Sequence, residues 1–136
     1  MKVVLDTMLW VSYCSLKDGY RYRLVERARR QRVRFFVSEY ILDELETVLT
    51  EDLELSQRFA VLARRAVLRI AKLVELPAST PSFVPGDPND DFIVQTALGG
   101  KVDYLITADK EILKVGKVEG IEILTPQQWD EILQPH

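Results

Sequence analysis

The sequence predicts a single α/β domain, residues 1–136, with a mostly parallel sheet of four to five strands and helices on both of its faces. Short apolar runs of strand length alternate along the chain with longer stretches of helical periodicity. This alternation is typical of parallel strands joined by crossover helices. The 136 residues have the usual size of one domain, and 47% apolar and 29% charged residues are globular proportions.

Four strands and six helices are predicted in order along the chain. The strands are expected at residues 3–5, 33–37, 104–106 and 121–124. The helices are expected near residues 21–31, 38–50, 54–73, 90–99, 110–115 and 126–133. Side chains suited to helix N-termini precede several of them, namely Ser38, Asn89, Asp109 and Thr125. The stretch 77–88 holds four of the six prolines and resembles a linker, but it is too short to separate two domains.

Several classes of protein are disfavoured by what the sequence lacks. No run approaches the roughly 18 apolar residues that a membrane span requires, and Asp6 comes too early for a signal peptide. The single cysteine, Cys14, excludes an intramolecular disulfide and a cysteine-based zinc cage. We therefore expect a cytoplasmic protein without a membrane segment. Trp10 and Trp129 are expected in the core.

Charge is distributed unevenly between two adjacent segments. Residues 21–34 contain seven arginines and one acid, Glu26, whereas residues 35–57 contain seven acids and no base. The two segments could be solvated faces of neighbouring helices. They could equally be a basic rim beside an acidic pocket, which suits an enzyme that holds a polyanion near bound cations. The pattern leaves both interpretations open.

Two acids directly follow predicted strands. Asp6 comes after the strand at 3–5, and Asp109 follows the strand at 104–106. Both are expected at the carboxyl edge of the sheet, where ligands bind in open α/β proteins. Asp91 belongs to an acidic turn that opens a helix. Each of these acids could instead cap or begin a helix, where its charge complements the helix dipole.

A fourth acid lies in the helix predicted at 38–50. At about 100° per residue, its apolar residues form an arc centred near Leu45, and Glu44 and Glu46 flank that arc on opposite sides. One of the two could reach the sheet edge, but periodicity does not choose between them.

Together these acids favour a site for hard divalent cations. Carboxylates about 5 Å apart repel by roughly 3 kcal/mol per pair at an effective dielectric constant of about 20, so a folded domain needs protons or cations to compensate. All-oxygen ligands without thiolate or imidazole select Mg²⁺ or Mn²⁺. Such ions support phosphodiester hydrolysis, whereas no Ser–His or Cys–His pairing for acyl transfer is found.

Four segments resemble motifs of the PIN domain family in order and spacing. They are Val4–Thr7, Ser38–Leu45, Asp87–Val94 and Asp103–Leu113. The resemblance extends nearly over the whole chain, and it is closest to the VapC-like toxin ribonucleases of prokaryotic toxin–antitoxin pairs. It implies a three-layer fold and a metal-dependent endoribonuclease that cleaves RNA. It also implies a homodimer and a cognate antitoxin protein as partners.

The resemblance also implies the site residues. The family's acids, as catalytic residues and ligands of Mg²⁺ or Mn²⁺, correspond to Asp6, Glu44, Asp91 and Asp109. Glu44 is thus preferred to Glu46 on the family pattern alone. Thr107 matches the Ser or Thr two positions before the last Asp, a hydrogen-bond partner of the site. The resemblance leaves the roles of the nearby Asp87 and Asp90 open.

The arginine-rich segment adds candidate RNA contacts. Tyr22 could stack on a base of single-stranded RNA, while Arg21, Arg23 and Arg27 could hold its phosphates. The same side chains could instead cover a solvated helix. Apolar surface left over on the helix at 54–73 would serve a dimer or a partner helix.

One residue departs from the family pattern. The family usually has Asn two places after the first Asp, where this chain has Met8. An amide can hydrogen-bond to carboxylates and substrate oxygens, whereas a thioether is only a very weak acceptor. The alternative hypothesis is therefore a PIN-fold module that binds RNA or protein with impaired catalysis. Receiver-type and haloacid-phosphatase chemistry are disfavoured, because Ser38 follows the second strand and no second Asp follows Asp6.

Overall fold

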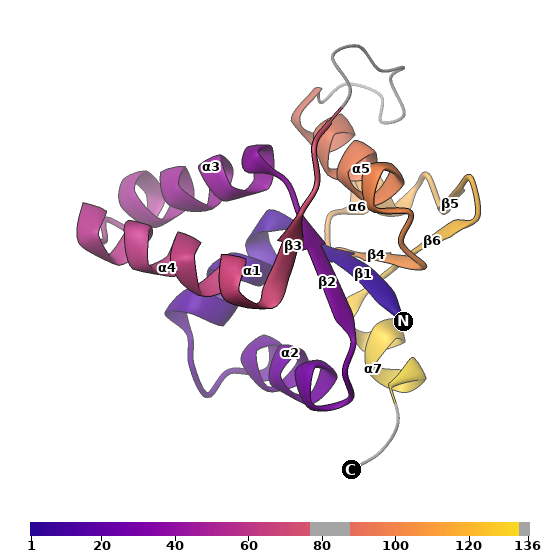
Figure 1. Ribbon diagram of the computed structural model, residues 1–136, viewed down its shortest axis with the longest axis horizontal. Coiled ribbons are helices and arrows are strands. Elements are labelled where there is room, and N and C mark those ends of the chain that lie inside the picture. Colours follow the sequence, from indigo (N-terminus) through magenta and orange to yellow (C-terminus); the bar gives the residue numbers. More distant parts are fainter. Residues whose placement is uncertain (77–87, 134–136) are drawn as a thin grey trace.

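The computed structural model (Figure 1) describes residues 1–76 and 88–133, with only the backbone for residues 88–90. Its strands are β1 (Lys2–Leu5), β2 (Arg34–Val37), β3 (Ala71–Leu73), β4 (Tyr104–Ile106), β5 (Lys117–Val118) and β6 (Ile121–Leu124). Its helices are α1 (Thr7–Ser15), α2 (Tyr20–Arg30), α3 (Glu39–Thr47), α4 (Gln57–Ile70), α5 (Pro88–Gly100), α6 (Lys110–Leu113) and α7 (Pro126–Ile132). A π-helical turn, η1 (Val48–Asp52), continues α3.

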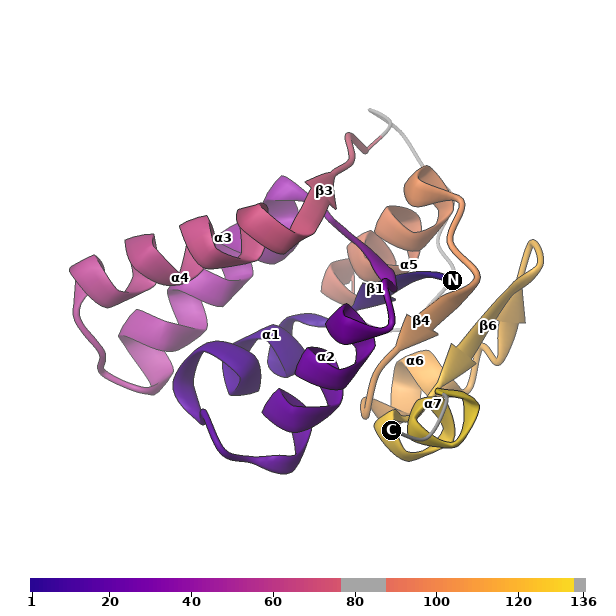
Figure 2. The same ribbon diagram turned by 60° about the horizontal axis from the view of Figure 1, so that its bottom comes forward.

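The strands form one mostly parallel sheet in the order β3-β2-β1-β4-β6-β5. Only the last pair, β5 and β6, is antiparallel. The central strands β1 and β4 are neighbours, with Leu5 paired to Ile106 at their carboxyl ends. The residues that follow these two strands therefore leave the sheet side by side. The turned view in Figure 2 shows α3 and α4 running alongside each other, away from the β5–β6 hairpin at the other end of the sheet.

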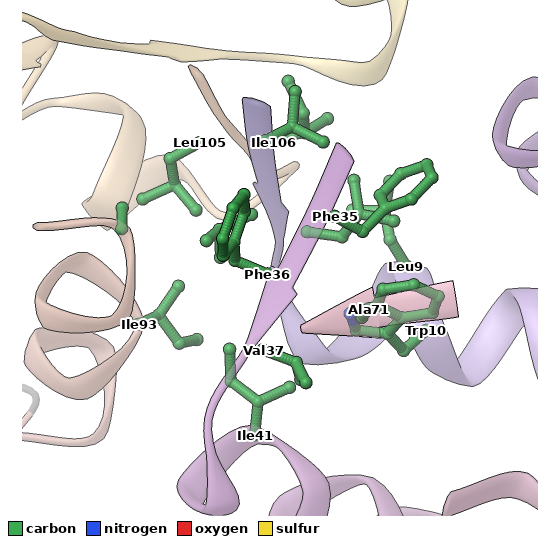
Figure 3. Close-up of a cluster of buried hydrophobic side chains, with 14 of the residues drawn as sticks. Leu9, Trp10, Phe35, Phe36, Val37, Ile41, Ala71, Ile93, Leu105 and Ile106 are labelled. Atoms are coloured by element: carbon green, nitrogen blue, oxygen red, sulfur yellow. The ribbon is translucent and has the colours of Figure 1, made fainter. Parts of the chain in front are cut away.

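The core has two halves, one on each face of the sheet (Figure 3). Successive residues of a strand point to opposite faces, so Phe35 lies with Leu9 and Trp10 of α1, whereas Phe36 lies toward Ile93 of α5. The Trp10 ring meets Phe35 edge-on at 5.8 Å between ring centroids. Trp129 of α7 meets the same Phe35 ring at 6.4 Å. Both tryptophans are fully buried, as the sequence predicted.

The predicted fold class is confirmed, and so are all four predicted strands. Ser38, Asp109 and Thr125 each cap a helix through the side chain. Asn89 does not precede its helix, because α5 already begins at Pro88. The linker-like stretch 77–88 lies outside the described residues, apart from the start of that helix.

The sheet has six strands rather than the predicted four to five, because β3 and the short β5 were not predicted. The helix predicted at 54–73 ends at Ile70, and Ala71–Leu73 forms β3, paired with β2 from Phe35↔Ala71 to Val37↔Leu73. A short apolar run fits either state, and the free edge of β2 decided between them. The helix α1 was missed. Its buried residues lie around most of its circumference, so it shows no 3.6-residue apolar stripe to recognise.

No helix among residues 1–76 and 88–133 combines the length and the apolar character needed to cross a membrane.

The end of α5 approaches β2 closely because Gly100 has no side chain. A Cβ added at Gly100 would lie 3.1 Å from Val102 Cγ1 and 3.2 Å from Phe36 Cγ, both buried in the core. A Cβ at Gly99 would meet the Glu75 carbonyl oxygen at 3.4 Å, an ordinary contact. Gly100 therefore sets the distance between α5 and the sheet.

We predict that Gly100→Ala lowers the free energy of unfolding by about 1–3 kcal/mol, because the new methyl overpacks a stiff strand residue. Gly99→Ala is the matched control. It should leave stability unchanged or raise it by up to about 1 kcal/mol, since alanine is the better helix former. Urea unfolding of both variants measures the difference. Equal stabilities would contradict the close approach at Gly100.

Candidate active site

A cavity of about 460 Å³ lies at the carboxyl edge of the central strands. Three carboxylates and one guanidinium face it, each from a different segment of the chain. The described lining consists of Asp6, Thr7, Met8, Arg21, Glu44, Val48, Ile93, Ala108, Asp109 and Ile112. The sheet therefore brings together three of the four acids predicted as site residues.

Asp6 is the most buried of these acids, with 5% of its surface exposed. It follows β1 directly, and its backbone N–H donates to the Ile106 carbonyl at 3.0 Å. Its Oδ1 accepts the Leu9 N–H at 3.2 Å and so caps α1. Its Oδ2 accepts the hydroxyl of Thr107. The capping role considered from the sequence thus coexists with a place in the cavity.

The electrostatics of Asp6 reflect this position. Burial raises the pKa of its carboxyl group, and the hydrogen bonds from Thr107 and Leu9 oppose the rise. The charge of Arg21 lowers the same pKa, whereas the charge of Asp109 raises it. The charged form of Asp6 is thus opposed by burial and by Asp109, and a bound cation would stabilise it.

Thr107 joins the ends of β1 and β4. Its side chain is fully buried, and its Oγ1 donates to Asp6 while it accepts the Asp109 N–H at 3.0 Å. One hydroxyl thus orients the Asp6 carboxylate and fixes the start of the turn to α6. Asp109 itself is exposed and caps α6, with Oδ1 accepting the Glu111 N–H at 2.8 Å.

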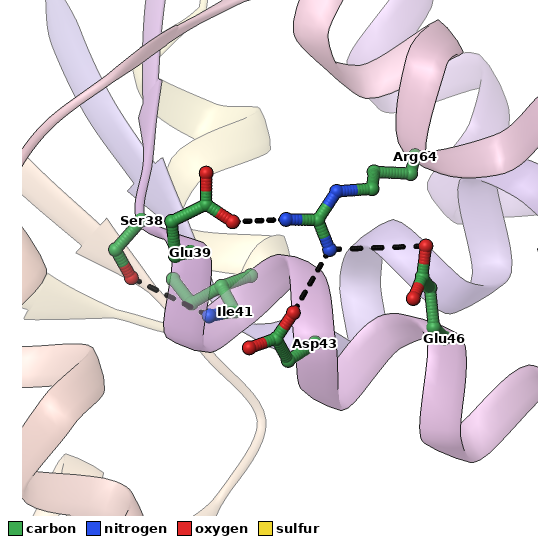
Figure 4. Close-up of polar contacts among 6 residues, drawn as sticks. All are labelled: Ser38, Glu39, Ile41, Asp43, Glu46 and Arg64. Carbon is green, nitrogen blue, oxygen red and sulfur yellow. Dashed lines mark hydrogen bonds and ion pairs between the residues drawn. The ribbon is translucent and has the colours of Figure 1, made fainter. Parts of the chain in front are cut away.

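The two glutamates left open by periodicity point in different directions. Glu44 is half-buried and lines the cavity. Glu46 faces α4 instead, where Arg64 lies 3.7 Å from its Oε1 (Figure 4). The same guanidinium pairs with Glu39 and Asp43, so Arg64 gathers the acids on one side of α3. Only Glu44 of these acids lines the cavity.

The remaining predicted acids have different positions. Asp91 is buried in the first turn of α5, at 8% exposure, but it is not part of the cavity lining, which Ile93 reaches from the same helix. Asp87 lies outside the described residues. Asp90 lies in α5, but its side chain is also outside the described part of the chain.

The four candidate RNA contacts do not share one environment. Arg21 lines the cavity, and Arg23 is exposed on α2. Tyr22 stacks on Tyr13 with ring centroids 5.1 Å apart, which leaves it half-buried. Arg27 forms an ion pair with Asp130 of α7, and its side chain is only 16% exposed. Arg27 thus connects α2 to α7.

Thr7 is a lining residue that sequence reasoning did not single out. It is 2% exposed, and its Oγ1 is buried without a hydrogen-bond partner among the described residues. Its neighbour Met8 is half exposed and also lines the cavity. The signal that could have found Thr7 is the N-cap at Asp6, because Thr7 is the first residue of the helix that Asp6 caps.

The donor set suits a hard divalent cation. Among the described residues, no three His, Cys, Asp or Glu side chains already meet as a metal site. Mg²⁺ usually takes one or two carboxylates directly and keeps several waters. The cavity offers carboxylate oxygens of Asp6, Glu44 and Asp109 and room for a hydrated ion. These three residues would hold such an ion.

The chain belongs to the PIN domain family, whose sequence model matches residues 2–111. The match runs from β1 to the start of α6 and includes all four predicted site acids. No curated protein sequence matches the chain.

Solved structures show the same fold. A chain of VapBC2 from Rickettsia felis, crystallised with a DNA fragment from the promoter, matches with a TM-score of 0.65 at 13% identity, over 92% of this chain and 98% of that one. VapC20 of Mycobacterium tuberculosis, a sarcin–ricin loop cleaving toxin, matches with a TM-score of 0.57 at 17% identity, over 86% of this chain and 97% of that one. At such identities the likeness is one of fold.

We predict that Thr107→Val destabilises the protein by about 1–3 kcal/mol, because the buried Asp6 carboxylate and the Asp109 N–H both lose a partner. Thr107→Ser is the control, since it keeps the hydroxyl and removes only a methyl group. The loss of stability in Thr107→Ser should be smaller than that in Thr107→Val. Chemical denaturation of the two variants gives the comparison. Similar losses would mean that packing, rather than the hydroxyl, accounts for the effect.

Proposed function

We propose that this PIN-domain protein is a divalent-metal-dependent endoribonuclease and the toxin component of a toxin–antitoxin pair. The observation that carries the proposal is the gathering of Asp6, Glu44 and Asp109 around one cavity at the carboxyl edge of the sheet. Asp91 is kept as a fourth candidate because of the family pattern.

The acids of the cavity are suited to hold Mg²⁺ or Mn²⁺. When bound, such an ion would activate water and neutralise charge on the attacked phosphate. Asp6 is held in place by Thr107 and Leu9, so its orientation does not depend on a ligand. Glu44 reaches the cavity from α3, on the side opposite Arg64. A buried, hydrogen-bonded carboxylate together with a half-exposed one is suited to an ion that keeps part of its water shell.

The RNA class of substrate is supported by charge around the cavity. Arg21 lines the cavity, so a phosphate chain entering the site would meet its guanidinium. Arg23 is exposed on α2 and is not among the described residues that line this cavity. Arg30 lies beside Arg23 and Tyr22 along another hollow on the same helix. Arg27 is a weaker candidate for RNA contact, because Asp130 already neutralises it.

The partner assignment rests on the family and on exposed apolar surface. Val61, Leu62 and Leu68 of α4 are each at least 40% exposed. Apolar side chains gathered on one helix are typical of a protein–protein contact. The R. felis relative is a VapBC pair. We infer an antitoxin protein and a second copy of the chain as partners, in the cytoplasm.

We expect Asp6→Asn to reduce Mn²⁺-dependent cleavage of a labelled single-stranded RNA by at least about 100-fold, because a charged group at the reacting centre is lost. The amide keeps an oxygen for the α1 cap, and thermal unfolding checks that the variant folds. Equal cleavage by wild type and variant would refute the proposal, as would no cleavage with either Mg²⁺ or Mn²⁺.

The same assay has a matched control on α3. Glu44→Gln should slow cleavage by about 10-fold or more, as expected when a group around a metal is changed. Glu46→Gln should leave the rate near that of the wild type and change stability by at most about 1 kcal/mol, because its only described ion pair is partly exposed. Equal effects of the two changes would argue against Glu44 as a site residue.

A second candidate function is a PIN-fold module that binds RNA or protein with impaired catalysis. The observation that favours it is Met8, whose half-exposed thioether lies in the cavity wall. A thioether cannot donate a hydrogen bond to Asp6 or to a phosphate oxygen. In that case RNA would bind without being cut.

We predict that Met8→Asn raises Mn²⁺ affinity, measured by calorimetry, by about 3- to 10-fold, because an amide can orient carboxylates around the ion. Cleavage should rise in parallel if the protein is an enzyme. Met8→Leu is the control, since it keeps the apolar character and should match the wild type. If Met8→Asn also matches the wild type, Met8 does not limit the site.

A further inference from the structure

The candidate active site contains one positively charged group in its described lining, the guanidinium of Arg21. Arg21 lies in the first turn of α2, which begins at Tyr20 after Gly19. It therefore comes from a different segment than the acids, which follow β1, lie on α3 or follow β4. The fold brings this cation to the acids across the cavity.

Arg21 differs from other arginines of the chain in its surroundings. Arg27 pairs with Asp130, Arg29 pairs with Glu26, and Arg64 pairs with three acids. Each of these arginines holds two helices or two turns together. By contrast, no hydrogen bond or ion pair joins the Arg21 guanidinium to another residue in the described ranges, although its charge acts on Asp6. None of the described residues therefore occupies its donors.

A phosphodiester bound in this cavity needs a positively charged partner, because the phosphate and the surrounding carboxylates are all negative. Each carboxylate of the cavity repels the negative charge of a phosphate. A guanidinium attracts the phosphate and presents two parallel N–H donors to its oxygens. Met8, which also lines the cavity, offers no side-chain donor. Arg21 is the described lining residue that can make this contact.

We propose that Arg21 contacts the phosphodiester of the RNA directly. Its guanidinium would form a bidentate hydrogen bond to the phosphate and position it next to the carboxylates of the cavity. The inference rests on the proposed nuclease function and assigns a substrate-binding residue within that site. Exposed arginines such as Arg23 would attract RNA through screened charge alone. Arg21 would position the phosphate.

A purely structural role for Arg21 and a direct contact with phosphate predict different properties for variants of Arg21. If Arg21 only compensated the charge of Asp6, its loss would destabilise the fold, and lysine would replace it fully. If it contacts phosphate, its loss would impair RNA handling while Mn²⁺ affinity stays equal or rises, because a cation leaves the neighbourhood of the bound ion. Lysine would restore only part of the lost RNA cleavage, since it lacks the planar guanidinium with its two parallel N–H donors.

The experiment compares Arg21→Met, Arg21→Lys and Arg23→Met with the wild type. Methionine keeps an unbranched apolar stem but removes the charge, and Arg23→Met is the matched control on the exposed side of α2. Cleavage of labelled single-stranded RNA with Mn²⁺ gives kcat and KM, calorimetry gives Mn²⁺ affinity, and thermal unfolding gives Tm. Fluorescence anisotropy measures binding of the same RNA.

We expect Arg21→Met to lower kcat/KM by about 10- to 100-fold, the factor for losing a hydrogen bond to a charged group. The kcat/KM of Arg21→Lys should lie between the values of Arg21→Met and the wild type. The kcat/KM of Arg23→Met should stay within about threefold of the wild-type value. Mn²⁺ affinity should not fall in Arg21→Met. The proposal is overturned if Arg21→Met cleaves like the wild type, if Arg23→Met loses as much, or if Tm and Mn²⁺ affinity fall together with activity.

Failure of the proposed nuclease function would give different cleavage and binding results from failure of the Arg21 proposal. If the wild type cleaves no RNA with either metal, the nuclease proposal fails, and anisotropy then decides the role of Arg21. Weaker RNA binding by Arg21→Met than by Arg23→Met would support the phosphate contact. Equal binding by the two variants would overturn it.

Discussion

The site depends on the hydrogen bond that the Thr107 hydroxyl donates to Asp6 across the ends of β1 and β4. A carboxylate only 5% exposed is costly to keep charged unless donors compensate it. Thr107 supplies one donor and the Leu9 N–H supplies another, and these contacts also define the start of α1. The same hydroxyl accepts the Asp109 N–H, so the turn into α6 is tied to the same point. The position of two site acids thus follows from one buried contact between adjacent strands.

The uneven charge of the sequence is resolved by pairing between helices. Arg64 of α4 draws three acids to one side of α3 and leaves Glu44 on the side that faces the cavity. In the basic segment, Arg27 is paired with an acid of α7, whereas Arg21 remains in the cavity. Neither interpretation considered from the sequence covers this pairing: Arg27 and Arg64 join neighbouring helices, while Arg21 and Glu44 remain at the cavity.

Local patterns predicted most of the fold because their physical causes are local. Apolar runs marked the four main strands, and hydroxyl or carboxylate side chains marked the starts of helices at Ser38, Asp109 and Thr125. Two of the failures, β3 and α1, arose where distant partners decide. The residues of β3 became a strand because β2 had a free edge, and α1 is buried on too many sides to show a periodic stripe. Both outcomes depend on neighbours that come from elsewhere in the chain.

By itself, the sequence determined the α/β class, the strand-edge position of Asp6 and Asp109, and through its motifs the family to which the chain belongs. These features follow from periodicity and from residues that directly succeed a strand. Periodicity left both Glu44 and Glu46 open, and the family motif favoured Glu44. Only the tertiary structure showed that Glu44 lines the cavity and that Arg21 is the arginine of α2 that stands among the acids. A helix has many faces, and the face that meets the site is chosen by the packing of the other helices against it.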